Sequence, residues 1–174
     1  GEIISADSRQ VYRGMDIGTG KDLREYKLRG KEIPHHLIDI ANPQEVYNVF
    51  QFQKDFKNAF SEIQERHNFP ILCGGTGFYI KAVLMDFHLP AVAPDHKLRK
   101  KLENWDLEDL IQKLESSSPD VSTNSSLETK RRVIRAIEVN KKKKKKKHKS
   151  PNPRVIIKNP LVLGVEDSRK VIRE

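Results

Sequence analysis

The stretch I-I-S-A-D-S-R-Q-V-Y, residues 3–12, decides the fold that this sequence predicts. Residues 1–6 contain the short β-branched run of a buried strand. Asp7 and Ser8 follow at the exit of that strand, where such residues favour a turn or a helix cap. In open α/β sheets, ligands bind at the carboxyl ends of the strands. Asp7 and Ser8 could therefore belong to a ligand-binding or catalytic site, or they could only cap the next segment.

A second strand end of the same kind occurs later in the chain. Residues 71–73 predict a second central strand, and residues 79–85 predict a helix. The turn between them is Gly74-Gly75-Thr76-Gly77, whose N–H groups can converge on an anion, although glycines also serve tight turns for steric reasons alone. In a parallel sheet, Asp7 and Thr76 would lie at the same edge, which favours a site there.

One helix and one short strand are predicted between these two strands. Residues 42–45, Asn-Pro-Gln-Glu, have the parts of a helix start with a capping box. An apolar stripe at three- and four-residue steps then predicts a helix that ends near Asn68, before Pro70. Residues 33–40 predict the short strand. The stripe consists of Val49, Phe52, Phe56, Ala59 or Phe60, and Ile63.

Two motifs that suggest other sites do not fit their patterns. The glycine-rich residues 13–21 contain Gly-Thr-Gly-Lys, but a G-x-x-x-x-G-K-[ST] phosphate loop needs glycine at Met15 and Ser or Thr at Asp22. His35 and His36 are adjacent, so on a strand they would point to opposite faces, and no cysteine or carboxylate cluster accompanies them. No metal site is expected there.

Strand signals stop at Pro90, and a helical segment follows. Residues 95–104 and 106–116 predict two helices, residues 116–126 a serine-rich loop, and residues 127–140 a third helix. On the third helix, three arginines fall within one arc of about 100° and three apolar residues within the opposite one. Three guanidinium groups should therefore project together, either as a solvated face or as phosphate ligands. The arginines are Arg131, Arg132 and Arg135, and the apolar residues are Val133, Ile134 and Ile137.

The net charge of +9 is concentrated in one segment. Residues 141–149 hold eight lysines, and without them 25 basic residues face 24 acidic ones. The run predicts a flexible linker, or alternatively a non-specific attraction to nucleic acid. After it, residues 154–157 and 161–165 are strand-like, and residues 166–174 begin another helix.

The predicted layout is α/β, with parallel strands alternating with helices. Residues 1–89 form the core, residues 90–150 an all-helical insertion, and residues 151–174 a return to the core. Cys73 is the single cysteine, which excludes an internal disulfide, and no apolar run approaches the roughly 18 residues of a membrane span. A soluble, cytoplasmic protein without a signal peptide is expected.

Several segments, in this order, closely resemble the tRNA dimethylallyltransferase family: residues 7–21, 34–40, 74–79, 89–99 and 131–139. The resemblance implies a sheet of the P-loop nucleoside triphosphatase type with a helical tRNA-binding insertion. It also implies transfer of a dimethylallyl group from dimethylallyl diphosphate to N6 of the adenosine just 3′ of the anticodon, in tRNAs that read codons beginning with U. The implied partners are the tRNA anticodon stem-loop and dimethylallyl diphosphate, and the implied state is a monomer.

The same resemblance implies the roles of individual residues. Asp7 would take the proton from the adenine amine, with Ser8, Arg9 and Gln10 lining the pocket of a flipped-out base. Gly74, Gly75 and Gly77 would form a substrate loop. The remaining residues implied to contact tRNA are Thr76, Arg99, Arg131, Arg132, Val133, Ile134 and Arg135.

Departure of the diphosphate normally needs a phosphate loop and Mg²⁺, and these 174 residues contain neither that loop nor ligands for the ion. The chain by itself is therefore expected to be catalytically silent. Two other classes stay open, a P-loop kinase-like nucleotide-binding protein and a non-catalytic RNA-binding remnant.

Overall fold

The computed structural model describes residues 1–87, 89–90, 92–117, 127–143, 157 and 159–165. The chain divides into two compact units. The sheet unit comprises Gly1–Glu45, Asp55–Asp86 and Arg154–Glu174, and the helical unit comprises Val46–Lys54 and Phe87–Pro153. Each unit is described by itself.

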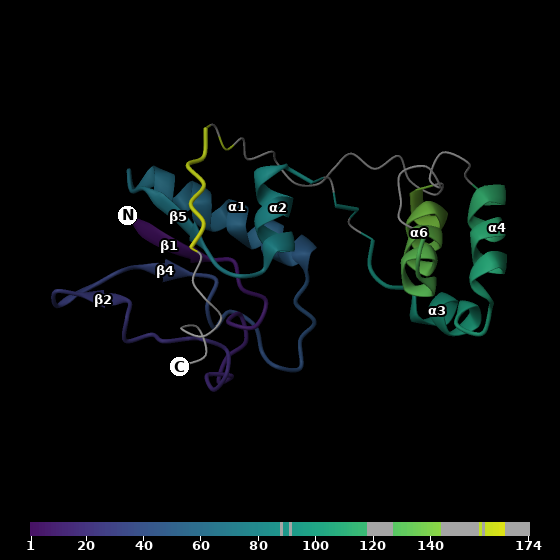
Figure 1. The fold of residues 1–174 in the computed structure, drawn as a ribbon, viewed down its shortest axis with the longest axis horizontal. Coiled ribbons are helices and arrows are strands. Elements are labelled where there is room, and N and C mark those ends of the chain that lie inside the picture. The colour runs from purple at the N-terminus through teal and green to yellow at the C-terminus, as the bar shows by residue number, and fades with distance from the viewer. Residues whose placement is uncertain (88, 91, 118–126, 144–156, 158, 166–174) are drawn as a thin grey trace. The chain divides into compact units, whose positions relative to one another are not determined.

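The sheet unit is built on three parallel strands, β1 (Glu2–Ser5), β4 (His35–His36) and β5 (Pro70–Cys73), in the order β4-β1-β5 (Figure 1). Ile4 of β1 is aligned with His36 on one side and with Leu72 on the other. Ile4 and Ala6 are completely buried. The predicted strand at the N-terminus and the parallel sheet are confirmed.

Strand β5 forms where it was predicted, but its position in the sheet differs from the prediction. Among the described residues it is hydrogen-bonded to β1 alone. Ile71 is 45% exposed, as befits a strand with one open edge. The prediction of a second central strand is therefore wrong within the described part of the chain.

The strand predicted for residues 33–40 is wrong beyond His36. Leu37 has φ of 65° and Asp39 has φ of 55°, and these left-handed conformations cannot continue a strand. The segment instead turns and runs beside Val11, whose carbonyl accepts from both Ile40 N and Ala41 N at 2.9 Å. A small antiparallel hairpin, β2 (Lys27–Leu28) and β3 (Lys31–Glu32), precedes it and was not predicted.

Helix α1 (Val49–Glu65) begins seven residues after the predicted cap at Asn42. The capping box lies at Asn48, whose Oδ1 accepts from Phe50 N at 3.0 Å and whose N–H donates to Gln51 Oε1 at 2.9 Å. Asn42 and Glu45 do pair through Nδ2 and Oε1 at 2.8 Å, but they close a turn. The predicted helix start is therefore wrong, although one bond of its capping box forms, from Asn42 N to Glu45 Oε2 at 3.3 Å.

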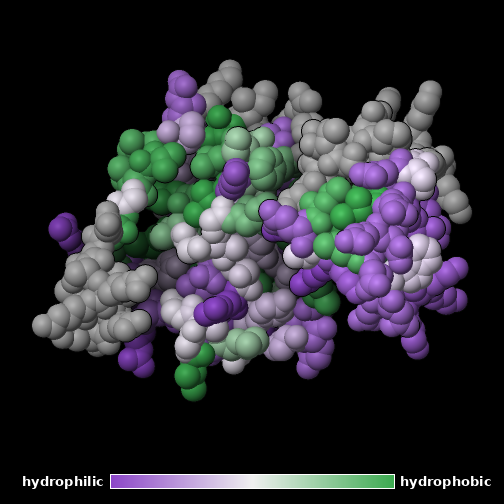
Figure 2. Space-filling model, turned by 45° about the vertical axis from the view of Figure 1, so that its right-hand side comes forward, coloured by the Kyte–Doolittle hydropathy of each residue, from purple (hydrophilic) through white to green (hydrophobic). Residues whose placement is uncertain are grey.

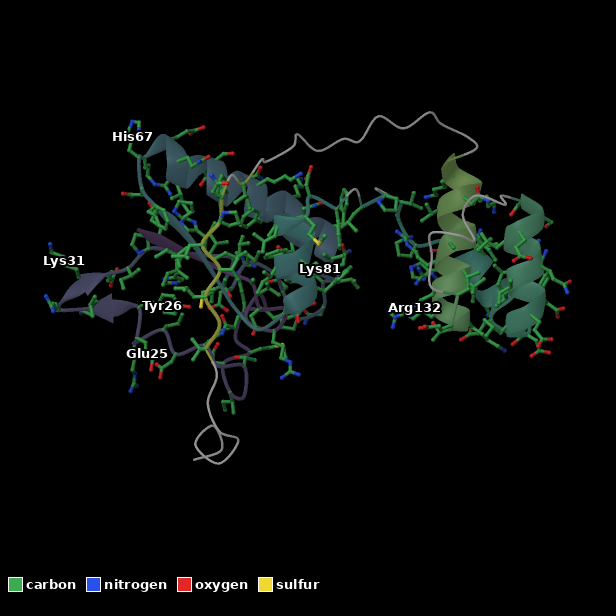
Figure 3. The ribbon with its side chains drawn as sticks, turned by 45° about the horizontal axis from the view of Figure 1, so that its top comes forward. Glu25, Tyr26, Lys31, His67, Lys81 and Arg132 are labelled. Atoms are coloured by element: carbon green, nitrogen blue, oxygen red, sulfur yellow. The ribbon has the colours of Figure 1, made fainter. Side chains whose placement is uncertain are left out.

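The apolar stripe and the end of α1 agree with the prediction. Phe52, Phe56, Ala59 and Ile63 are buried. After Glu65 the helix closes with a Schellman motif, in which His67 N bonds Gln64 O at 2.9 Å and Asn68 N bonds Ile63 O at 3.0 Å. His67 takes the left-handed conformation at this end of α1, where Figure 3 labels it.

A buried carboxylate ties the end of α1 to the sheet. Glu2 of β1 accepts from Arg66 Nε at 3.0 Å and Nη2 at 2.8 Å, and from Asn68 Nδ2 at 2.7 Å. His36 Nε2 on β4 lies 2.7 Å from Glu2 Oε2. The hydrogen bonds from Arg66, Asn68 and His36 hold the pKa of Glu2 far below its usual range. Glu2 is the first residue of β1, so this tie lies at the amino end of that strand.

The helical unit contains α3 (His96–Leu102), α4 (Leu107–Ser117) and α6 (Lys130–Lys143). All three predicted helices are present, and the apolar face of the third is as expected, because Val133, Ile134 and Ile137 are buried. Figure 2 shows a mainly hydrophilic surface on this unit, and every exposed large hydrophobic residue described except Val46 belongs to the sheet unit. Its core consists of Leu102, Leu110, Leu114, Val133, Ile134 and Ile137.

The strand expected at residues 161–165 is wrong, because the segment pairs with no strand among the described residues and is not a strand there. Its hydrophobic side chains are between 69% and 100% exposed. The predictions for residues 118–126, 144–156 and 166–174 lie outside the described residues. No helix in the described part of the chain is long and apolar enough to cross a membrane.

Candidate functional site

The carboxyl ends of β1 and β5 meet at one edge of the sheet. Beyond the strands, Ala6 N bonds Cys73 O at 2.7 Å, and Thr76 N bonds Ala6 O at 3.1 Å. Ser8 N then donates to Thr76 Oγ1 at 3.0 Å, and Thr76 Oγ1 lies 3.3 Å from Ser8 Oγ. The structure thus brings together the two strand ends that carry Asp7 and Thr76.

The turn after β5 needs glycine at one position. Gly74 has φ of 156°, and a Cβ built on it would lie 2.5 Å from Ala6 O, closer than any side chain could come. At Gly75 and Gly77 a Cβ would meet nothing within 4 Å. The turn leads into α2 (Gly77–Leu84), the helix predicted there. The steric explanation therefore holds for Gly74 only.

Two of the four N–H groups of this turn are engaged within the fold. Thr76 N bonds Ala6 O, and Gly77 N bonds Gly75 O at 3.1 Å. Thr76 stands at the cap position of α2 but makes no side-chain cap, because its hydroxyl bonds Ser8. The turn thereby supports the residues after β1.

Asp7 is half-buried, and its two carboxylate oxygens have different surroundings. Oδ1 accepts from Arg9 N at 2.8 Å and from Gln10 N at 3.3 Å, which holds the carboxylate in a turn. Oδ2 makes no hydrogen bond within the described part of the chain. Asp7 is therefore a cap through one oxygen, and the other remains available to a ligand.

Tyr79 on α2 is near this carboxylate. Its side chain is buried, and burial, followed by the nearby charges of Tyr12 and Asp7, raises the pKa of Tyr79 to about 12. The phenol therefore stays neutral near pH 7 and adds no negative charge beside Asp7.

The other residues implied to line a base pocket differ in what they contact. Ser8 and Arg9 are exposed beside Asp7. Gln10 is turned into the fold: its Oε1 accepts from Ser5 Oγ at 2.8 Å, and its Nε2 donates to Gly20 O at 3.1 Å. Gln10 therefore fastens the glycine-rich loop to the end of β1.

Lys21, at the end of that loop, points inward. Its side chain is completely buried, and Nζ lies 2.5 Å from Asp39 Oδ1 and 3.2 Å from Asp16 Oδ1, and also donates to Tyr12 O. Burial lowers the pKa of Lys21, but the hydrogen bonds and charges of Asp39 and Asp16 outweigh it and leave the pKa raised. Lys21 therefore forms buried ion pairs within the fold, and its ammonium group is not accessible to a phosphate.

The arginines of the helical unit do not all project together. Arg131 and Arg132 are exposed, and Arg132 Nη1 pairs with Glu128 Oε2 at 2.7 Å near the first turn of α6 (Figure 3). Arg135 turns back, so the prediction of three guanidinium groups projecting together is wrong for that residue. Val133 and Ile134 are buried in the core, and their side chains are not available to RNA.

The partner of Arg135 is Glu138, a residue that the sequence patterns did not single out. Its side chain is 1% exposed and accepts from Arg99 Nε at 2.6 Å, Arg99 Nη2 at 2.8 Å and Arg135 Nη1 at 3.1 Å. Asp95 N donates to it at 3.0 Å. Burial raises the pKa of Glu138, but the hydrogen bonds from Arg99, Asp95 and Arg135 lower it to about 2. The sequence did contain a signal for this buried ion pair, because Glu138 falls on the apolar side of the helix, three residues after Arg135.

No three His, Cys, Asp or Glu side chains in the described ranges gather closely enough to hold a metal ion. The family resemblance implies Mg²⁺, and no ligand for that ion is assigned within this chain.

These observations define an α/β protein of the parallel type, with a half-open carboxylate at the carboxyl edge of its sheet and a helical unit that presents arginines. The family model described as IPP transferase matches residues 10–174, and the chain belongs to that family. The predicted family is thereby confirmed.

Curated proteins of similar sequence agree with this family assignment. A "tRNA dimethylallyltransferase 2" of Bacteroides fragilis is 44% identical over 99% of this chain and 56% of its own length. A "tRNA dimethylallyltransferase 1" of Syntrophus aciditrophicus is 46% identical over 99% of this chain and 56% of its own length. The chain thus spans about half the length of the curated relatives it matches.

A solved eukaryotic dimethylallyltransferase, described as acting on tRNA, is similar in structure. The TM-score is 0.63 at 27% identity, over 83% of this chain and 38% of that one. The predicted fold class, a parallel α/β sheet of the P-loop nucleoside triphosphatase type, is confirmed.

Proposed function

We propose that this chain carries the adenine-accepting part of a tRNA dimethylallyltransferase. The reaction is transfer of a dimethylallyl group from its diphosphate to N6 of the adenosine just 3′ of the anticodon, in tRNAs that read codons beginning with U. A tRNA substrate implies a cytoplasmic enzyme, and we propose that it acts as a monomer. The observation that carries the proposal is Asp7, with one oxygen held by two N–H groups and the other open.

The chemistry explains why a carboxylate is needed at this position. The exocyclic amine of adenine is a poor nucleophile because its lone pair is delocalised into the ring, and it must lose a proton as the new N–C bond forms. Oδ2 of Asp7 can accept that proton if the base is turned out of its stack toward the edge of the sheet. The N–H groups of Arg9 and Gln10 hold Oδ1, which orients the acceptor oxygen.

Three residues around Asp7 are proposed to contact the tRNA. Ser8 and Arg9 are exposed beside the carboxylate and are proposed to contact the flipped nucleotide. Thr76, proposed as a further tRNA contact, also supports Ser8 through its hydroxyl.

We propose the helical segment, residues 90–150, as the tRNA-binding domain. Arg131 and Arg132 are exposed on α6, and Arg99 and Arg135 are each about one third exposed. Arginine suits phosphate contact because its planar group donates two parallel hydrogen bonds.

No group described here is assigned to the diphosphate. The sequence has no G-x-x-x-x-G-K-[ST] motif, Lys21 is buried, and no step of the proposal runs through a metal ion. We therefore expect no prenyl transfer by the 174 residues alone. A kinase-like nucleotide site gains no support from the family match.

The proposal is tested in a chimaera in which these residues replace the matching segment of the Bacteroides fragilis relative. Asp7→Asn keeps the size and hydrogen-bonding reach of the side chain but removes its ability to take a proton. General-base catalysis contributes about 10² to 10⁴ in rate, so single-turnover transfer should fall by about that factor while tRNA affinity changes by less than about tenfold. Asn is an equally good cap, so a rate within about threefold of the parent would remove Asp7 from the mechanism.

A further inference from the structure

The buried carboxylate of Glu138 joins two arginines from different helices. Arg99 on α3 gives it two hydrogen bonds, at 2.6 and 2.8 Å, and Arg135 on α6 gives it one, at 3.1 Å. Arg135 Nη2 also donates to Val92 O at 2.7 Å. Both guanidinium groups are thereby held in one orientation each, beside one another.

Both arginines keep hydrogen-bond donors that these contacts do not occupy. A guanidinium group has five N–H donors, and each of these two spends two of them on described partners, which leaves three. The side chains of Arg99 and Arg135 are 38% and 36% exposed, whereas Glu138 is 1% exposed. The carboxylate is buried, whereas both arginine side chains are partly exposed and keep donors that no described partner uses.

The charge at this place favours an anion. Two guanidinium groups share one carboxylate, so the cluster carries a net positive charge. The neighbouring carboxylate, Asp95, is engaged by Leu98 N at 3.0 Å and by Lys141 Nζ at 3.8 Å. Holding the arginines in place before binding also reduces the rotamer entropy that an RNA contact would cost.

We propose that Glu138 is a positioning residue for RNA binding, which holds Arg99 and Arg135 as a paired site for backbone phosphate. The inference rests on the proposed function, since it gives a tRNA-binding role to Arg99 and Arg135. It adds that these arginines act as one unit through a carboxylate that never touches RNA.

The test measures RNA affinity of the 174-residue chain by fluorescence anisotropy, with an anticodon stem-loop and with an unrelated hairpin. Glu138→Gln should weaken binding by about tenfold, because the two guanidinium groups are no longer held by a charged anchor. The slope of log affinity against log salt should also become shallower, by about 0.7 to 0.9 for each phosphate that the protein no longer neutralises.

Coupling separates positioning from a purely structural role. Arg99→Ala should weaken binding by about tenfold in the parent but by less than about twofold in the Glu138→Gln background. Equal effects of Arg99→Ala in the two backgrounds would overturn the inference, and so would unchanged RNA affinity in Glu138→Gln.

A matched control comes from the sheet unit. Glu2 is also a buried carboxylate held by a bidentate arginine, but it lies at the amino ends of the strands. Glu2→Gln should lower thermal stability without changing RNA affinity or its salt dependence. An equal loss of affinity in Glu2→Gln would show that general destabilisation explains both effects, and the inference would be wrong.

A second variant serves if Glu138→Gln does not fold. Arg135→Lys keeps the charge but cannot span Glu138 and Val92 O with one planar group, so it should weaken binding almost as much as Arg135→Ala. Parent-like binding by Arg135→Lys would overturn the inference. If the parent does not prefer the stem-loop to the hairpin, the proposed function fails, while the Glu138 effect on both RNAs still decides this inference. No RNA binding by the parent would overturn both.

Discussion

Ser8 N donates a hydrogen bond to Thr76 Oγ1 over 3.0 Å, although 68 positions separate the two residues in the chain. The contact joins the turn after β1 to the turn after β5, next to the carboxylate of Asp7. Thr76 stands at the cap position of α2 without capping it, so its hydroxyl supports the candidate site instead of the helix.

Thr76→Val should therefore lower the rate of transfer in the chimaera. The substitution keeps the shape of the side chain but removes a net hydrogen-bond contribution of about 1 kcal/mol, or roughly fivefold in rate. Thr76→Ser keeps the hydroxyl and should transfer at close to the parent rate. Single-turnover rates and tRNA affinities of both variants provide the measurement. Equal rates for the Val and Ser variants would contradict the supporting role.

Gly74→Ala should destabilise the sheet unit strongly. The added Cβ would lie 2.5 Å from Ala6 O, and relieving that contact would separate β1 from β5, at a cost of about 2 to 4 kcal/mol. Gly75→Ala is the matched control, since a Cβ there meets nothing and the change should stay within about 0.5 kcal/mol. Urea unfolding of both variants checks the difference, and similar midpoints would contradict it.

Lys21→Met should act on stability and not on the prenyl donor. The substitution leaves Asp39 and Asp16 without their buried cation and should cost about 1 to 3 kcal/mol of unfolding free energy. Lys31→Met, at the exposed hairpin labelled in Figure 3, should change stability by less than about 0.5 kcal/mol. Donor affinity of the chimaera should not respond to Lys21→Met, and a large loss of that affinity with unchanged stability would show a phosphate role.

The stability supplied by Glu138 should disappear in acid. Its pKa falls from 4.5 to about 2 on folding, so the ionised carboxylate stabilises the fold above pH 4.5 and loses that effect as the pH falls toward 2. The difference in unfolding free energy between the parent and Glu138→Gln should therefore narrow over this range, by about 3 kcal/mol at most. Thermal or urea unfolding between about pH 6 and about pH 2 measures it. A difference that stays constant over this range would contradict the assignment.

Elements with a regular period of hydrophobic residues were predictable from the sequence. The stripe of α1, the apolar face of α6 and the short apolar runs of β1 and β5 each depend on neighbours only a few positions away. The start of α1 was mistaken because the N–H groups of Asn42 and Asn48 both donate to the side chain three residues later, Glu45 and Gln51 respectively. Local chemistry alone does not distinguish a closed turn from the first turn of a helix.

The sequence by itself determined the family, the parallel α/β class and the place of Asp7 at a strand end, because motif spacing and periodicity are local properties. Only the tertiary structure decided how the polar side chains are used. Lys21 and Gln10 face inward, and Arg135 turns to Glu138 rather than outward with Arg131. A buried charge requires a partner, and that partner is set by which elements pack together, as with Arg99, which lies 39 positions from Glu138 in the chain.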